Sequence, residues 1–148
     1  MARRRPQYED DRAFLQGTVE TLFGESVKVY TGADMDLTTF LGSKTIKPPA
    51  VCIAFMGFSY SEGMENSGEP GVDSYSVFVC LGAPGAAFGA KRSDAEQMAR
   101  EIVRALVKQN VYELVATPGT YRSCTVSNGQ NLFLTLGFDA FEIQLTIN

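Results

Sequence analysis

The C-terminal residues 141–148 most constrain the fold of this chain, because apolar and polar side chains alternate along them without a break. Successive side chains of a β-strand point to opposite faces of a sheet, so the alternation predicts an antiparallel strand with one face in the core. The side chains that we expect to face that core are Phe141, Ile143, Leu145 and Ile147.

Residues 8–23 predict a first helix. Asp10 and Asp11 fall in its first turn, where negative charge complements the helix dipole. Gly24 lies where a helix would stop. The apolar stripe expected to pack on the sheet consists of Leu15, Val19, Leu22 and Phe23.

Residues 93–109 predict a second helix with a clearer start. Ser93 and Glu96 have the spacing of a capping box. Glu96 and Arg100 are four residues apart and are expected to form an ion pair on the solvent-facing side. The apolar stripe, which is typical of a helix packed on a sheet, consists of Ala95, Met98, Ala99, Ile102, Val103 and Leu106.

Further segments predict the remaining strands, and they are residues 27–30, 50–58, 72–81, 120–127 and 132–136. The uninterrupted apolar run 50–58 indicates a strand with both faces covered. Asn128-Gly129 predicts a two-residue hairpin turn, so that 132–136 would pair back on 120–127. The expected fold class is α+β, a mostly antiparallel β-sheet with two amphipathic helices packed on one face.

A length of 148 residues predicts a single domain over 1–148. Residues 1–7 contain three successive arginines and are expected to form a flexible basic N-terminus, either a solvated tail or a contact arm. The acidic, glycine-rich segment 60–71 is expected to be an exposed hairpin loop, and 31–49 is a long connection without a clear assignment. We find neither a secretory signal nor a membrane span in the sequence pattern.

The chemistry of the chain is sparse, because it contains no histidine, the usual general base near neutral pH. Cys52, Cys80 and Cys124 are widely spaced and are expected to be buried thiols. Tyr121-Arg122 could stack on a base, but no basic and aromatic surface accompanies this pair. A net charge of −4 also disfavours binding to DNA phosphates. We therefore expect no catalytic residue, no metal and no cofactor.

The layout of the whole chain resembles the phage tail terminators, the tail-completion proteins of lambda-like and Mu-like phages. The likeness comprises the opening amphipathic helix, the strand Val27-Lys28-Val29-Tyr30, the proline-led apolar strand that starts at Pro49, the helix 93–109, the Tyr121-Arg122 strand and the alternating C-terminal strand. The resemblance is one of element order and size.

This resemblance implies a structural virion protein at the head-proximal end of the tail, present in the host cytoplasm during assembly and not in a membrane. It implies a six-membered ring of identical subunits that caps the tail tube, ends tube polymerisation and presents a surface to the head–tail connector or neck proteins. DNA would pass through the ring without specific binding. By position, candidate contacts with a neighbour or with the tube are Tyr60, Met64, Glu65, Phe88, Lys91 and Arg92, and exposed loop residues without a contact role are the alternative.

Two other functions fit the sequence. One is another head–tail joining or neck protein of similar size. The other is an enzyme or a small-ligand-binding module that uses Asp, Glu or Tyr, which would require an apolar pocket with converging carboxylates and shifted pKa values.

Overall fold

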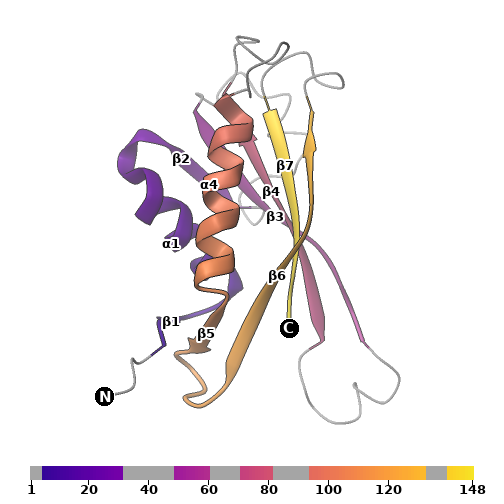
Figure 1. Ribbon diagram of the computed structural model, residues 1–148. Helices are drawn as coiled ribbons and strands as arrows, with labels where there is room; N and C mark the ends of the chain where they lie inside the picture. The colour runs from indigo at the N-terminus through magenta and orange to yellow at the C-terminus, as the bar shows by residue number, and fades with distance from the viewer. Residues whose placement is uncertain (1–4, 32–48, 61–70, 82–93, 133–139) are drawn as a thin grey trace.

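The computed structural model describes residues 5–31, 49–60, 71–81, 94–132 and 140–148 (Figure 1). In chain order its elements are β1 (Gln7–Tyr8), α1 (Asp11–Phe23), a 3-10 turn (Gly24–Ser26), β2 (Lys28–Thr31), β3 (Ala50–Ser59), β4 (Val72–Cys80), α4 (Asp94–Lys108), β5 (Val111–Leu114), β6 (Tyr121–Asn131) and β7 (Ala140–Ile147). The predicted α+β class is confirmed. Residues 1–4 lie outside the described ranges, as do residues 32–48 and 61–70 of the predicted connections 31–49 and 60–71.

The strands form one sheet with the order β1-β5-β6-β7-β4-β3-β2. The inner neighbours pair antiparallel, whereas the outermost strands β1 and β2 pair parallel with β5 and β3. Figure 1 shows α1 and α4 on the same side of this sheet, as the sequence predicts. One face of a mostly antiparallel sheet is therefore covered by the two helices.

Helix α1 begins at Asp11 and not at residue 8, because Asp10 caps it. The Asp10 Oδ1 atom accepts a hydrogen bond from the backbone N–H of Ala13 at 2.7 Å, which satisfies an amide that has no partner within the helix. Of the predicted stripe, Leu15 and Val19 are buried, and Phe14, which the pattern did not include, is buried with them. Leu22 is 40% exposed because it lies at a hollow beside α4 and not over the sheet.

Helix α4 agrees with its predicted pattern. The stripe residues Ala95, Ala99, Ile102 and Leu106 are all buried, and Met98 and Val103 pack against them. The predicted ion pair forms, with Arg100 Nε 2.7 Å from Glu96 Oε2 on the outer side of the helix. Ser93 lies outside the described ranges, so the capping box remains a prediction.

The core between the helices and the sheet is continuous across the central strands. It consists of helix residues together with the helix-facing side chains Val51, Ile53, Tyr75, Val77, Val79, Tyr112, Cys124, Ile143, Leu145 and Ile147. Three of the four side chains predicted to face inward from β7 belong to this buried cluster, and Phe141 packs against it partly buried.

A second, smaller cluster lies on the opposite face of the sheet, where it consists of Ala50, Cys52, Ala54, Phe78, Cys80, Leu132 and Ala140. The prediction that β3 is covered on both faces is thus confirmed for residues 50–54. The three cysteines are free and buried, as expected. Burial raises the pKa of Cys52 to about 11 and that of Cys124 to about 12, so both remain thiols at neutral pH.

The predicted turn at Asn128-Gly129 is wrong. Neither residue has a positive φ, and β6 continues through them after a bulge at Ser127, pairing Asn128 with Gln144 and Gly129 with Ile143. The hairpin propensity of the dipeptide is outweighed by this continuous ladder with β7. The bare Cα of Gly129 also leaves room for the ring of Phe141, which a Cβ there would meet at 2.9 Å.

Two short strands were not predicted, namely β1 and β5. Gln7 of β1 lies opposite Glu113 of β5, and their side chains are joined by a hydrogen bond of 2.7 Å from Gln7 Nε2 to Glu113 Oε1. Residues 111–114 carry too little alternation to distinguish them from the end of the preceding helix. The predicted strand 132–136 falls mostly outside the described residues.

Candidate assembly surfaces

Of the six residues predicted as assembly contacts, the structure describes only Tyr60. Its side chain is 47% exposed, and its ring contacts Phe58 edge-on, with centroids 5.6 Å apart. The other five, Met64, Glu65, Phe88, Lys91 and Arg92, lie outside the described ranges, so their predicted role stays a prediction.

Tyr60 belongs to a group of exposed aromatic rings at the end of β3, which we call the β3 aromatic surface and define as Phe55, Phe58 and Tyr60. Phe55 is 39% exposed and Phe58 66% exposed. The prediction that residues 55–58 are covered on both faces is therefore wrong. Figure 1 shows the reason, because the ends of β3 and β4 extend beyond the two helices that cover the rest of this face.

A β-bulge places Phe55 and Phe58 on the same face of the sheet. Phe55 lies opposite Tyr75 and Phe58 opposite Asp73, with Met56 as the extra residue between the two pairs. Without the bulge, two positions three residues apart would point to opposite faces. Gly57 has a φ of 143°, a conformation that side chains rarely adopt, so the glycine is suited to this position.

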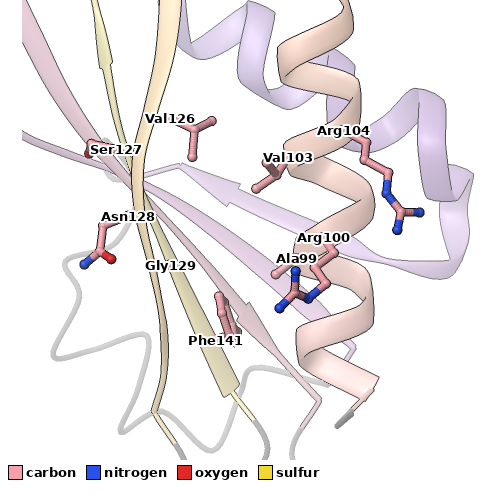
Figure 2. A pocket seen from close by; sticks show the side chains of 9 residues that line it. All are labelled: Ala99, Arg100, Val103, Arg104, Val126, Ser127, Asn128, Gly129 and Phe141. Carbon is pink, nitrogen blue, oxygen red and sulfur yellow. The ribbon is translucent and has the colours of Figure 1, made fainter.

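A hollow of about 410 Å³ lies between α4 and β6. Figure 2 shows Val103 and Val126 pointing toward each other across it, with Phe141 at one end and Asn128 turned away from the helix. Arg100 and Arg104 stand on the helix side, and Arg100 is engaged by Glu96. The hollow thus combines an apolar floor with two positive charges at its rim.

A buried polar cluster joins both layers of the fold, and we define it as Asp11, Asp73, Tyr112 and Arg122. Arg122 Nη2 lies 3.0 Å from Asp11 Oδ2 and 2.9 Å from Asp73 Oδ2. Arg122 Nε donates to Asp11 Oδ1 at 3.3 Å, and the Tyr112 hydroxyl donates to the same oxygen. The cluster therefore ties the first turn of α1 to β4, β5 and β6.

The electrostatics of the cluster follow from its burial. Arg122 is 4% exposed, Asp11 8% and Tyr112 0%. Burial by itself would lower the pKa of Arg122, but the hydrogen bonds and charge of Asp11 raise it overall. The pKa of Asp73 is raised by burial first and by the neighbouring carboxylate of Asp11, against the lowering effect of Arg122. Burial and the bond to Asp11 also raise the pKa of Tyr112.

This arrangement suits a structural tie better than proton transfer. Both oxygens of Asp11 already accept hydrogen bonds, and an arginine stays charged at any accessible pH. The hollow between α4 and β6, the one beside Leu22 and α4, and the one between the end of α1 and β2 are lined by other side chains. Within the same ranges, no group of three His, Cys, Asp or Glu side chains is placed to hold a metal ion.

The cluster corrects the sequence interpretation of Arg122, which cannot stack on a base because its guanidinium is buried against two carboxylates. Tyr121, its neighbour, is 54% exposed. The sequence contains a signal that Arg122 is buried, since Arg122, Cys124 and Val126 alternate on one face of their strand. An arginine in such a series requires a buried acidic partner, although the sequence does not show which one.

None of the helices in the part of the chain that the structure describes has the length and apolar character needed to cross a membrane. Neither a protein-family model nor a curated protein sequence matches this chain.

Proposed function

We propose that this chain is a structural subunit of a phage tail, a terminator that assembles as a closed, six-membered ring on the end of the tail tube. In this role it ends tube polymerisation and provides the surface on which head–tail joining takes place. DNA passes through the ring without specific binding, and the subunit itself catalyses no reaction.

The observation that carries the proposal is the β3 aromatic surface. Its three rings are 39%, 66% and 47% exposed, and Met56 beside them is 55% exposed. Contiguous apolar side chains on a surface mark sites of protein association, and aromatic residues are enriched in such interfaces. The surface also includes Tyr60, which the likeness in layout to tail terminators indicates as a contact.

The state of the ionisable groups supports assembly over catalysis. The carboxylates of Asp11 and Asp73 both point at the guanidinium of Arg122 and not into an open pocket. A structural role requires such groups to hold the layers together, whereas a catalytic role requires at least one of them to reach a substrate.

Electron microscopy of tail tubes tests the proposal. The tail-tube protein of the same phage would be polymerised in vitro with and without the purified full-length protein. We expect rings at one tube end and shorter tubes when the protein is present. A protein that never associates with tube ends, at any ratio to the tube protein, would overturn the proposal. Binding to the portal-side complex instead would favour another head–tail joining or neck protein.

A pair of variants tests the contact surface. Phe58→Ser removes the most exposed ring of the β3 aromatic surface, and Val107→Ser removes a side chain of similar exposure, 63%, from α4. We expect Phe58→Ser to leave tubes uncapped and Val107→Ser to cap them normally. Equal capping by both variants would exclude this surface from the contact.

The hollow between α4 and β6 favours a second candidate, a small-ligand-binding module. Its volume of about 410 Å³ falls within the usual range for ligand pockets, roughly 300–1,000 Å³. Arg100 and Arg104 at its rim would suit an anionic ligand. Native mass spectrometry of the purified protein distinguishes the two candidates, because a ligand module would retain a bound small molecule and would not form rings.

A further inference from the structure

The two longest strands of the sheet, β3 and β6, each continue beyond the shorter strand at their outer side. β2 pairs only with Ala50–Ile53 of β3. The following stretch, Ala54–Ser59, pairs with β4 on one side and with no described strand on the other. We call this stretch the β3 edge.

β6 has a corresponding stretch on the other side of the sheet. β5 pairs only with Tyr121–Ser123, and the next amide, of Cys124, donates to the carbonyl of Asn110 at 2.7 Å. From Thr125 to Gln130, β6 pairs with β7, and among the described residues no strand lies on its outer side. Figure 1 shows β6 running on well past the end of β5. We call this stretch the β6 edge.

Neither edge carries the charge or the proline that often keeps sheet edges from pairing with other chains, and a β-bulge interrupts each of them once, at Met56 and at Ser127. Residues 54–59 read Ala-Phe-Met-Gly-Phe-Ser and residues 125–130 read Thr-Val-Ser-Asn-Gly-Gln, so both lack charge and proline. Lysine, proline, very short strands and β-bulges are the usual protections, so the bulge is the one that the two edges share. The outermost strands β1 and β2 are protected by their lengths of two and four residues, whereas each of the two edges leaves paired residues on both sides of its bulge.

The strand directions allow the two edges to pair between copies of the chain. β3 is antiparallel to β4, β4 to β7 and β7 to β6, so β3 and β6 run in opposite directions. A second copy placed beside the first in the same orientation brings its β6 edge antiparallel to the first copy's β3 edge. Six residues on each side give roughly 20 Å of ladder and about six backbone hydrogen bonds.

The register across the sheet sets how the copies are displaced. Within one copy, Ala54 of β3 and Asn128 of β6 lie at the same height along the strands. Ala54 pairs with Ser76 of β4, which pairs with Gln144 of β7, and Gln144 pairs with Asn128. Full overlap of the two edges places Ala54 opposite Gln130 of the neighbour, which shifts the copies by about two residues, or roughly 7 Å, along the strands. A stagger of this kind between neighbouring strands tilts them, as it does when a sheet closes into a barrel.

We propose that the β3 edge of one copy binds the β6 edge of a second copy, so that the sheet continues from subunit to subunit. The two edges differ, so the interface is heterologous, and every copy can bind a neighbour on each side. Such an interface closes into a ring or extends as a filament. The inference rests on the proposed function, because it names the surfaces through which the ring assembles.

Lysine substitutions on each edge test the interface by sedimentation velocity over a wide concentration range. Phe58→Lys charges the β3 edge and Gln130→Lys the β6 edge. Tyr121→Lys is the matched control, since it charges an exposed position of β6 that already pairs with β5. We expect the unmodified protein and the control to self-associate and both edge variants to sediment as monomers. Circular dichroism and urea midpoints check that every variant is folded.

Mixing the two edge variants gives the sharper result. Each variant keeps the edge that the other has lost, so a 1:1 mixture should form a dimer and stop there. If either edge variant keeps the mass of the unmodified protein, or if the mixture stays monomeric, the inference is wrong. If an edge variant lost binding to tube ends but still self-associated, the edges would bind the tube protein and not a second copy. That result would also overturn the inference.

The same measurements separate this inference from the proposed function. Self-association that survives both edge substitutions refutes the edge contact and leaves the tail role intact. An unmodified protein that is monomeric at every concentration also refutes the edge contact. Failure to bind tube ends in the microscopy experiment is the outcome that refutes the tail role.

Discussion

Replacing Arg122 by methionine should destabilise the fold strongly, because it leaves a buried carboxylate without its countercharge. Asp11 is 8% exposed, and without the guanidinium the donor that it keeps among the described residues is the hydroxyl of Tyr112. The side chain of Asp73 is 27% exposed, so water can replace its lost partner. The cost therefore arises mainly at Asp11, and breaking a buried pair from one side costs about 3–5 kcal/mol.

Urea unfolding at pH 7 measures this cost as the change in the free energy of unfolding. The matched control is Arg100→Met, which breaks an ion pair of 2.7 Å whose side chains are 53% and 21% exposed. Exposed pairs at this helical spacing contribute about 0.3–0.5 kcal/mol. We thus expect the two substitutions to differ roughly tenfold in cost, although the broken pairs have similar lengths.

The double variant Asp11→Asn/Arg122→Met tests the physical reason. It removes both charges and retains a carbonyl oxygen that can accept the hydrogen bond of Tyr112. We expect it to be more stable than Arg122→Met alone, since no unpaired charge is then left in the core. A cost below about 1 kcal/mol for Arg122→Met, or a double variant less stable than that single variant, would refute the reasoning.

Three further predictions concern the core, the alkaline limit and the first helix. Leu106→Ala should cost about 2–5 kcal/mol because Leu106 is 1% exposed, whereas Val107→Ala, at a position 63% exposed, should change stability by less than about 0.5 kcal/mol in the same urea assay. Burial and then the charge of Asp11 raise the pKa of Tyr75 from 10.0 to about 12. The folded state therefore keeps the phenol proton to a higher pH than the unfolded state, so the free energy of unfolding should fall as the pH rises above 10. Tyr75→Phe should reduce that fall by up to about 2 kcal/mol, as measured by urea unfolding between pH 8 and 12. Asp10→Ala should cost about 1 kcal/mol through loss of the cap, with a matching loss of thermal stability by circular dichroism.

The parts of the fold that the sequence predicts well are those with a strong local period. The stripe of α4 and the alternation of β7 correspond to one buried face each, and both are buried as expected. These patterns are reliable because many side chains in a row must meet the same layer. The predicted start of α1 at residue 8 was wrong, because Asp10 is the cap and not a residue of the first turn, and the bond from Ala13 that makes it the cap is a feature of the folded chain.

The candidate surfaces were predicted less well, because exposure depends on how far the covering layer reaches. Phe55 and Phe58 read as core residues in an apolar run, yet they lie on a part of β3 that extends beyond both helices. No property of residues 50–58 alone distinguishes the covered half from the exposed half. The bulge at Met56 is a second reason that the surface was not predicted, because it turns Phe58 to the face that Phe55 occupies.

The sequence by itself determined the class of the fold, its two amphipathic helices, the inward face of the last strand and the buried state of the three cysteines. These properties depend on hydrophobic periodicity, which acts on each segment separately. Only the tertiary structure decided that Asn128-Gly129 continues a strand, that Arg122 meets Asp11 and Asp73, and that β3 and β6 continue past their outer neighbours in the part of the chain that the structure describes. Each of these depends on residues far away in the chain, and a partner at long range can override a local preference that is worth about 1 kcal/mol.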